Sequence, residues 1–355
     1  MGAQSMLKPK SFIFPGVMIL VTAAWFPLVC GSSAWAGNLD DESFTFRFPA
    51  ALSRFASYGD VAAVGGASAA SKWGSAINPA SIAWLASTEK PQFNLNPQYS
   101  LICFEEGTQL HVAAASGTIS RQEWGTFQTT VALAASSKGK TKSGLDFDFD
   151  MDYYQIQWGK RQQDWAWGVN FNYAPTETHF DIGALGISKS RADNYGIRLG
   201  GLNQLSDKLR AGLVVDYVIS RARTVLYDFM ELGIGDIKIK DTSHQYLVRP
   251  GISYEYKEDS AIFLDYQYFY ILDDTGSLEI HRLMTGIDHE LIDGFFVRGG
   301  TAVDVEGNVA LTGGVGIYPC NWLTIDIGYQ YDMFPELDVE FGRSHTLVAS
   351  LGLTF

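Results

Sequence analysis

The sequence predicts an all-β fold, a fourteen-stranded antiparallel transmembrane β-barrel. Three observations lead to this fold class. Apolar and polar residues alternate with a period of two along most of the chain, as strands with one apolar face do. The long connections between these strands all fall on one side of the strand order. The last strand alternates up to Phe355 and continues into no tail.

Composition and charge narrow the class of protein. The chain has 355 residues, of which 46% are hydrophobic and 14% aromatic, and 36 are glycine. Aromatic residues at this density suit the interfacial girdles of a membrane barrel. The formal net charge is −13, and so acidic a balance argues against nucleic acid as a partner.

The first segment of the chain reads as an export signal. Lys8 and Lys10 precede an apolar run over residues 12–29, and Ala34-Trp35-Ala36 follows as a small-residue cleavage site. This order is typical of a secretory signal peptide, which we place at residues 1–36. The alternative is a retained membrane anchor, and two prolines within the apolar run, Pro15 and Pro27, together with the small-residue ending, argue against it.

Residues 37–90 differ from the rest of the chain, because small residues dominate and alternation is weak. A glycine-alanine run that contains Gly65 and Gly66 is followed by Asn78-Pro79-Ala80, where Asn78 is a candidate helix cap. This combination resembles the amino-terminal signature of the FadL family of outer-membrane channels for hydrophobic compounds, whose relatives include PorV-like secretion proteins. The resemblance implies that the segment is a hatch closing the barrel from the periplasmic side. The alternative is a linker.

Residues 91–355 are predicted to form the barrel. The strands are expected at 92–102, 108–116, 124–135, 149–160, 164–174, 192–202, 208–220, 243–256, 260–271, 279–290, 294–304, 307–317, 321–332 and 343–355. The connections on the side of Phe355 are short, which is typical of periplasmic turns. The long ones, all on the other side, are Ser136–Asp148, Pro175–Arg191, Arg221–Asp241 and Met333–Gly342.

Alternation also predicts which side chains face the lipid. Trp165, Trp167 and Phe171 share one face of the fifth strand, and Ala166 and Asn170 share the other. The predicted lumen face carries charges of both signs: Arg198, Arg210, Asp216, Arg249, Glu255, Asp265, Asp288, Arg298 and Asp326. We expect them to pair across strands and to hold the hatch. The alternative follows from the resemblance to fatty-acid channels, in which Arg249 or Arg298 meets a ligand carboxylate.

Two long connections are unusually apolar for segments in water. They contain Phe180, Leu185, Leu226, Phe229 and Met230. In FadL proteins the corresponding loops form a groove that first captures the ligand, so the resemblance implies a ligand-binding role for these residues. The alternative is that they pack on one another as a cover. The resemblance also implies a lateral exit through a kink in the third strand, near whose start Gly125 lies.

No catalytic or metal-binding pattern emerges. The six histidines lack the spacing of a zinc site, and we predict neither a metal nor a cofactor nor an enzymatic activity. Cys103 and Cys320 are expected at opposite ends of the barrel, too far apart for a disulfide.

The sequence and the resemblance together predict a Gram-negative outer-membrane channel for passive uptake of small hydrophobic compounds of the fatty-acid or hydrocarbon type. Its expected partners are outer-membrane lipid and the hydrophobic ligand. The alternative is a PorV-like shuttle or scaffold that binds components of a secretion system. The identity of the ligand does not follow from these residues.

Overall fold

A computed structural model describes residues 59–72, 77–85, 91–137, 139–181, 186–227, 236–273 and 276–355. The predicted signal peptide, residues 1–36, lies outside these ranges. The strands are β1 (Gln92–Phe104), β2 (Gln109–Arg121), β3 (Gly125–Ser137), β4 (Gly139–Lys140), β5 (Asp146–Gln162), β6 (Trp165–Asp181), β7 (Ile187–Gln204), β8 (Leu209–Tyr227), β9 (Ile237–Lys257), β10 (Ser260–Leu272), β11 (Ser277–Ile292), β12 (Phe295–Asp304), β13 (Val309–Cys320), β14 (Leu323–Tyr331) and β15 (Ser344–Thr354). The described helical segments are α3 (Gly59–Ala63), η1 (Ser81–Leu85), η4 (Pro335–Leu337) and α4 (Asp338–Phe341).

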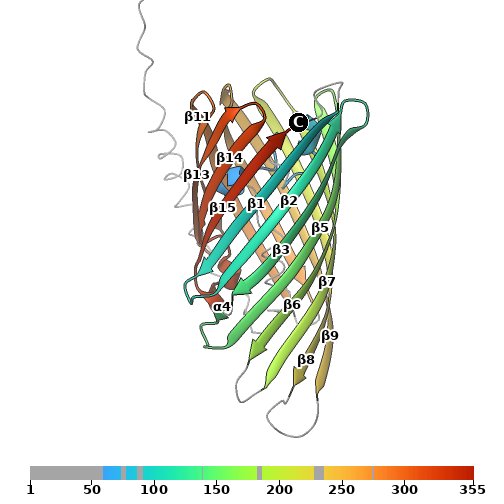
Figure 1. Cartoon of the computed structure of the whole chain (residues 1–355), viewed down its shortest axis with the longest axis vertical. Helices are drawn as coiled ribbons and strands as arrows, with labels where there is room; N and C mark the ends of the chain where they lie inside the picture. The colour runs from blue at the N-terminus through green and yellow to red at the C-terminus, as the bar shows by residue number, and fades with distance from the viewer. Residues whose placement is uncertain are drawn as a thin grey trace, which may run out of the picture.

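The strands form one closed antiparallel barrel (Figure 1). Each strand pairs with its neighbours along the chain, β15 pairs back onto β1, and β3 pairs with β5. The two-residue β4 extends the edge beside β5, so fourteen strands make the wall, as predicted. Closure gives the backbone hydrogen-bonding groups of every strand a partner, which a sheet in lipid requires. None of the described helices is long and apolar enough to span a bilayer.

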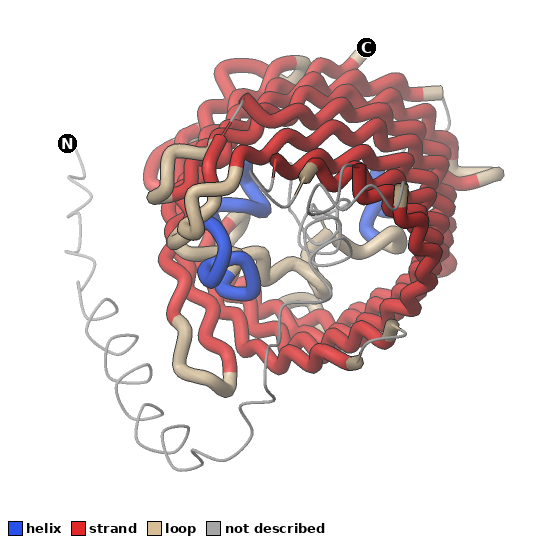
Figure 2. Tube along the Cα trace, turned by 90° about the horizontal axis from the view of Figure 1, so that it is seen from below, coloured by secondary structure: helices blue, strands red, loops and turns tan. Residues whose placement is uncertain are grey.

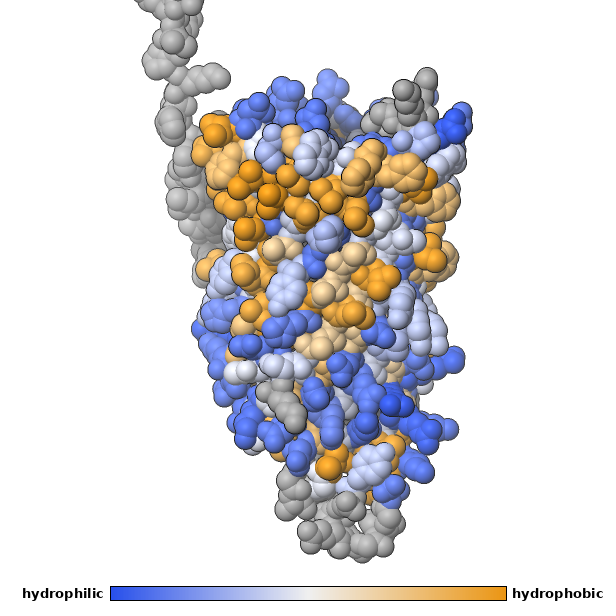
Figure 3. Space-filling model, viewed as in Figure 1, coloured by the Kyte–Doolittle hydropathy of each residue, from blue (hydrophilic) through white to orange (hydrophobic). Residues whose placement is uncertain are grey.

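The two faces of the wall differ as the alternation predicts. Trp165, Trp167 and Phe171 of β6 are exposed on the outside, whereas Ala166 and Asn170 are buried inside. On the face shown in Figure 3, apolar residues gather in an apolar belt over the upper part of the barrel, and the lower end is mainly hydrophilic. The carboxy-terminus lies at the upper end and α4 near the lower end (Figure 1). Below, these are called the carboxy-terminal end and the far end.

As predicted, the connections at the carboxy-terminal end are short and the longer ones lie at the far end. The strands, however, extend further toward the far end than predicted. The predicted loop Pro175–Arg191 is wrong over most of its length, because β6 continues to Asp181 and β7 begins at Ile187. The predicted loop Arg221–Asp241 is likewise mostly strand, through Tyr227 and from Ile237. Beyond the apolar belt the outer face is polar too. The sequence there no longer alternates between apolar and polar residues, although the hydrogen-bonded pairing of the strands continues.

An example of this polar outer face is the cluster around Glu177 of β6. Its carboxylate pairs with Lys189 at 2.8 Å and with Arg191 at 3.0 Å on β7. Exposed ion pairs of this kind stabilise a fold little. They nevertheless show that these residues lie in water rather than in lipid.

Tyrosine and histidine form hydrogen-bonded pairs on the outer face. Five of the six histidines form a hydrogen bond through Nδ1 with a tyrosine hydroxyl on another strand, which is the adjacent strand in every pair except Tyr256–His289, where β10 lies between. The pairs are Tyr99–His111, Tyr217–His244, Tyr256–His289, Tyr266–His281 and Tyr329–His345, at 2.6–2.9 Å. Such amphipathic rings are typical of the interfacial girdle of a membrane barrel. These histidines therefore belong to the outer surface and not to a site in the lumen.

Candidate functional site

The lumen has two different walls. The inner faces of β7–β14, here the charged wall, carry the ion pairs Arg198–Asp216 at 2.6 Å and Arg210–Glu255 at 3.0 Å. Arg298 lies between two carboxylates on this wall. Its guanidinium is 3.1 Å from Asp288 and 2.6 Å from Asp326. The predicted pairing of lumen charges across strands is thus what the structure contains.

The charged wall holds the described part of the hatch. Arg249 of β9 donates to the carbonyl of Gly66 at 3.0 Å and to the side-chain oxygen of Gln267. The carboxylate of Asp265 accepts the backbone N–H groups of Ser68 and Ala69, each at 2.8 Å. Hydrogen bonds to ionised groups are about twice as strong as neutral ones. Both Arg249 and Arg298 are therefore engaged by protein partners, and a ligand role for either stays a prediction.

The Asn78-Pro79-Ala80 motif fixes the second half of the described hatch. The side-chain amide of Asn78 donates to the carbonyls of Ala69 at 2.6 Å and Gly201 at 3.0 Å. Its Oδ1 accepts the N–H of Ala80 at 2.9 Å, the capping geometry expected before a helical turn. Asn78 thus links the hatch to the barrel wall. Helical segments and loops of the chain lie within the ring of strands (Figure 2).

A set of inner-face glycines lies beneath the hatch. A Cβ at Gly212 would overlap the carbonyl of Ala69, and one at Gly168 would overlap the carbonyl of Pro79. Similar contacts occur at Gly200, Gly286, Gly300, Gly314 and Gly328. Sequence reasoning missed this set, although glycine inside a strand is a signal of close backbone approach.

The opposite wall has no charge between its rims. The inner faces of β15, β1, β2, β3, β5 and β6, here the uncharged wall, carry no Asp, Glu, Lys or Arg over residues 344–354, 94–104, 110–120, 126–136, 147–159 and 166–180. Serine, threonine, alanine, glutamine and asparagine predominate. This wall is thus a continuous part of the lumen surface that contains no ion pair over these residues.

An apolar patch occupies the far end of this uncharged wall. It consists of the inner-face residues Ile102, Phe104, Leu110, Val112, Ala134, Phe147 and Phe149. The connection between β14 and β15, Met333–Gly342, folds over the patch and is here called the lid. Phe334, Leu337 and Phe341 of the lid are buried against it. The ring of Phe341 lies 4.9 Å from that of Phe147 and 5.2 Å from that of Phe104, between centroids.

Backbone hydrogen bonds and two acidic side chains fix the lid at the barrel rim. The N–H of Lys142 donates to the carbonyl of Glu340 at 2.7 Å, and that of Glu106 donates to the carbonyl of Phe341 at 3.3 Å. Burial and the charge of Asp332 raise the pKa of Asp338 to about 7. Burial also raises the pKa of Asp332. The pair therefore retains a proton near neutral pH.

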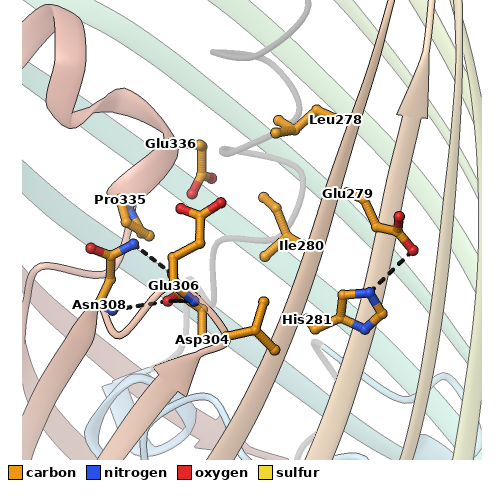
Figure 4. Close-up of a pocket in the computed structure, with 10 residues that line it drawn as sticks. Leu278, Glu279, Ile280, His281, Asp304, Glu306, Asn308, Pro335 and Glu336 are labelled. Atoms are coloured by element: carbon orange, nitrogen blue, oxygen red, sulfur yellow. Dashed lines mark hydrogen bonds and ion pairs between the residues drawn. The ribbon is translucent and has the colours of Figure 1, made fainter. Parts of the chain in front are cut away.

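A small pocket lies where the lid meets the turn between β12 and β13 (Figure 4). Glu306 of the turn and Glu336 of the lid reach into it, with Ile280 of β11 beside them. Burial and the charge of Asp304 raise the pKa of Glu306. The pocket therefore brings two carboxyl groups together where the lid meets the turn.

Two of the predicted groove residues lie in the described part of the chain. Phe180 is on the inner face of β6, and its ring lies 5.1 Å from that of Phe147 in the apolar patch. Leu226 is near the far end of β8, paired with Ile237. Leu185, Phe229 and Met230 lie outside the described residues. That these side chains bind a ligand remains a prediction.

The ladders do not place a lateral gap in the third strand. Pairing of β3 with β2 and with β5 is continuous from Thr126 to Ala135, and Gly125 is the first residue of the strand. The exit implied by the FadL resemblance is therefore absent from this stretch, because no proline or bulge interrupts it. Single ladders are interrupted instead at Pro97, Pro175 and Pro250. Proline has no N–H to donate.

Comparison with solved structures identifies the fold. No protein-family model and no curated protein sequence matches the chain. The structure is similar to the CymD monoaromatic hydrocarbon channel, with a TM-score of 0.54, 15% identity, and coverage of 84% of this chain and 96% of that one. It is similar to the Ralstonia pickettii toluene transporter TbuX, with a TM-score of 0.53, 16% identity, and coverage of 84% and 97%. A Pseudomonas aeruginosa FadL homologue gives a TM-score of 0.52, 11% identity, and coverage of 84% and 97%. The chain has the FadL-type barrel fold.

Proposed function

We propose that this protein is an outer-membrane channel through which small hydrophobic compounds diffuse inward. The single observation that carries the proposal is the uncharged wall, which begins at an apolar patch under the lid. An apolar solute crossing a lumen lined with charges would desolvate them, and uncompensated desolvation is costly. A continuous uncharged strip avoids that penalty.

The likeness to channels for monoaromatic hydrocarbons and toluene supports this class of cargo. The lid closes the far end of the path, and the hatch, with predicted bounds 37–90, closes the other. Passage then requires two movements, displacement of Phe334, Leu337 and Phe341 from the patch and rearrangement of the hatch. Neither movement involves bond chemistry, and we assign no catalytic group.

Blocking the path tests the proposal. Ala132 is buried on the inner face of β3, and Val131 beside it faces outward. Ala132→Trp should reduce uptake of labelled toluene, naphthalene and long-chain fatty acid into a Gram-negative host by tenfold or more, because the ring fills the path. Val131→Trp, an equally large change on the lipid face, is the matched control and should leave uptake within twofold of wild type.

The outcome separates channel from scaffold. If both variants and the wild type take up none of these compounds above a host without the protein, the channel proposal fails. Recovery of a bound secretion component with the wild-type barrel would then favour the PorV-like alternative. Surface expression and heat-modifiable migration of each variant confirm that the barrel has folded.

A further inference from the structure

Three buried polar side chains border the apolar patch. Among the residues that the structure describes, neither the oxygen nor the nitrogen of the Gln98 carboxamide has a hydrogen-bond partner, and nor do the hydroxyls of Ser100 and Thr346. Gln98 is 6% exposed, Ser100 1% and Thr346 0%. Most buried polar side chains are hydrogen-bonded, and leaving one unpaired costs roughly 1–3 kcal/mol. Three neighbouring exceptions in one place require an explanation.

The strand register places these side chains directly below the patch. Thr346 of β15 pairs with Ile102 of β1, a patch residue, and Ser100 pairs with Val112 of β2, another patch residue. Gln98 is the next inner-face position on β1 beyond Ser100, about 7 Å further along the strand. From the far end inward, the inner face of β1 therefore presents the apolar Ile102, then the hydroxyl of Ser100, then the carboxamide of Gln98.

The charge around this group is as informative as its polarity. Gln98 pairs in register with Ser350 on β15 and with Ala114 on β2, and Ser100 pairs with Val348 on β15. All of these positions belong to the uncharged wall, so no lysine or arginine side chain neighbours them there. A carboxamide and two hydroxyls donate and accept hydrogen bonds to neutral groups, but they do not compensate the buried charge of a carboxylate.

We propose that Gln98, Ser100 and Thr346 form a ligand subsite that recognises neutral hydrophobic compounds with one hydrogen-bonding group, such as a hydroxyl or a carbonyl. The apolar body of the compound lies on Ile102 and Val112, and its polar group bonds to Gln98. A free carboxylate is rejected, because it would be buried without a cation. This inference rests on the proposed function, since it requires that the patch admits a ligand when the lid moves.

A matched set of probes tests the subsite. Naphthalene, 1-naphthol and 1-naphthoate share one ring system and differ in having no polar group, a neutral hydroxyl and a carboxylate. Their binding to the full mature protein in lipid nanodiscs is measured at pH 7 by calorimetry, with empty nanodiscs subtracted. The wild type should bind 1-naphthol about three- to tenfold more tightly than naphthalene, the range expected for one net hydrogen bond. It should bind 1-naphthoate more weakly than either.

Substitutions then locate the preference. Gln98→Leu keeps the approximate volume and should abolish the naphthol advantage while leaving naphthalene affinity within twofold. The double variant Ser100→Ala with Thr346→Val provides a second, smaller reduction if Gln98→Leu folds poorly. Thr126→Val is the control, because the Thr126 hydroxyl is also buried and also has no hydrogen-bond partner in the described part of the chain, but lies near the start of β3. It should leave the preference unchanged.

The outcomes distinguish failure of the subsite from failure of the proposed channel function. If naphthalene and 1-naphthol bind the wild type equally, or if both the Gln98 variant and the double variant keep the naphthol advantage, the subsite is disproved while a hydrophobic channel stands. Tighter binding of 1-naphthoate would overturn the neutral selectivity. If none of the three probes binds, the proposed function itself fails, and the subsite fails with it.

Discussion

The charged wall and the uncharged wall of the same lumen differ in the kind of contact that each makes with the segments inside the barrel. On the charged wall, Arg249 and Asp265 bind backbone groups of the hatch, and ion pairs such as Arg198–Asp216 lie on the same wall. On the uncharged wall, contacts at the far end are mainly apolar and lie between the patch and the lid. Charged side chains with fixed geometry hold the hatch firmly, so its rearrangement should be the harder of the two movements in the proposed path. The lid contacts the patch mainly through apolar side chains, with a few backbone hydrogen bonds at the rim, so its displacement should be the easier one.

The largest effect is expected from breaking the charged wall. Arg298→Leu would leave Asp288 and Asp326 buried without their cation, and removal of one partner from a buried pair costs about 3–5 kcal/mol. Urea unfolding in lipid vesicles measures this loss. Arg343→Leu is the control, because the Arg343 side chain is 57% exposed and its pairs should contribute less than about 1 kcal/mol. Equal losses in the two variants would contradict the structural role of the charged wall.

A large increase in leakage through the barrel is expected when a substitution displaces the hatch and leaves every charged residue in place. Gly212→Leu would push a side chain into the carbonyl of Ala69. Liposome swelling with small sugars should then rise several-fold above the wild-type rate. Gly201→Leu offers a matched control, since a Cβ there has no neighbour within 4 Å. Swelling that stays at the wild-type rate for Gly212→Leu would mean that the described hatch residues do not seal the lumen.

A smaller, local effect is expected at the lid. Phe341→Ala removes a fully buried ring from the apolar patch, and a Phe-to-Ala truncation in a core costs about 3–5 kcal/mol when the whole fold depends on it. Here the loss should fall on lid closure, so limited trypsin cleavage after Arg343 should accelerate while urea unfolding of the barrel changes little. Val305→Ala, in an exposed turn nearby, should change neither. A destabilised barrel with an unchanged cleavage rate would show that the lid is part of the rigid wall.

The smallest effect is expected from pH. Because the pKa of Asp338 is raised to about 7 when the lid is closed, the closed lid binds a proton that an open lid with an ordinary carboxyl pKa releases. Closure is therefore favoured at pH 5 and weakens as the pH rises through about 7. Trypsin cleavage after Arg343, corrected for the activity of trypsin on a peptide substrate, should be several-fold faster at pH 8 than at pH 6. Asp338→Asn should flatten this dependence, whereas an unchanged slope would exclude Asp338 as its cause.

The sequence predicted the wall better than the contents of the lumen. Residues such as Trp165 and Ala166 could be assigned to opposite faces because lipid on one side and polar contacts on the other enforce a period of two. The continuation of β6 past Pro175 was not predicted, because residues 176–179 are polar on both faces and show no alternation. Strand pairing depends on backbone groups that composition does not report.

The lid and the subsite were harder to find for different reasons. Phe334, Leu337 and Phe341 recur at spacings of three and four, a helical signal inside a segment predicted only as a long loop. That signal could have been used. Gln98 gives no comparable signal, because an unpaired carboxamide is recognised only once its neighbours on β15 and β2 are known.

The attachment of the hatch to late strands has a consequence for the order of folding. The N–H of Gly59 donates to the hydroxyl of Ser350, 291 positions later, and the carbonyl of Ala62 accepts from Gln330, 268 positions later. Contacts so distant along the chain form slowly, because closing the intervening loop has an entropic cost. The hatch must therefore wait for nearly the whole chain before it reaches its final position. Seating of this described part of the hatch is therefore expected to be completed only when the last strands have formed.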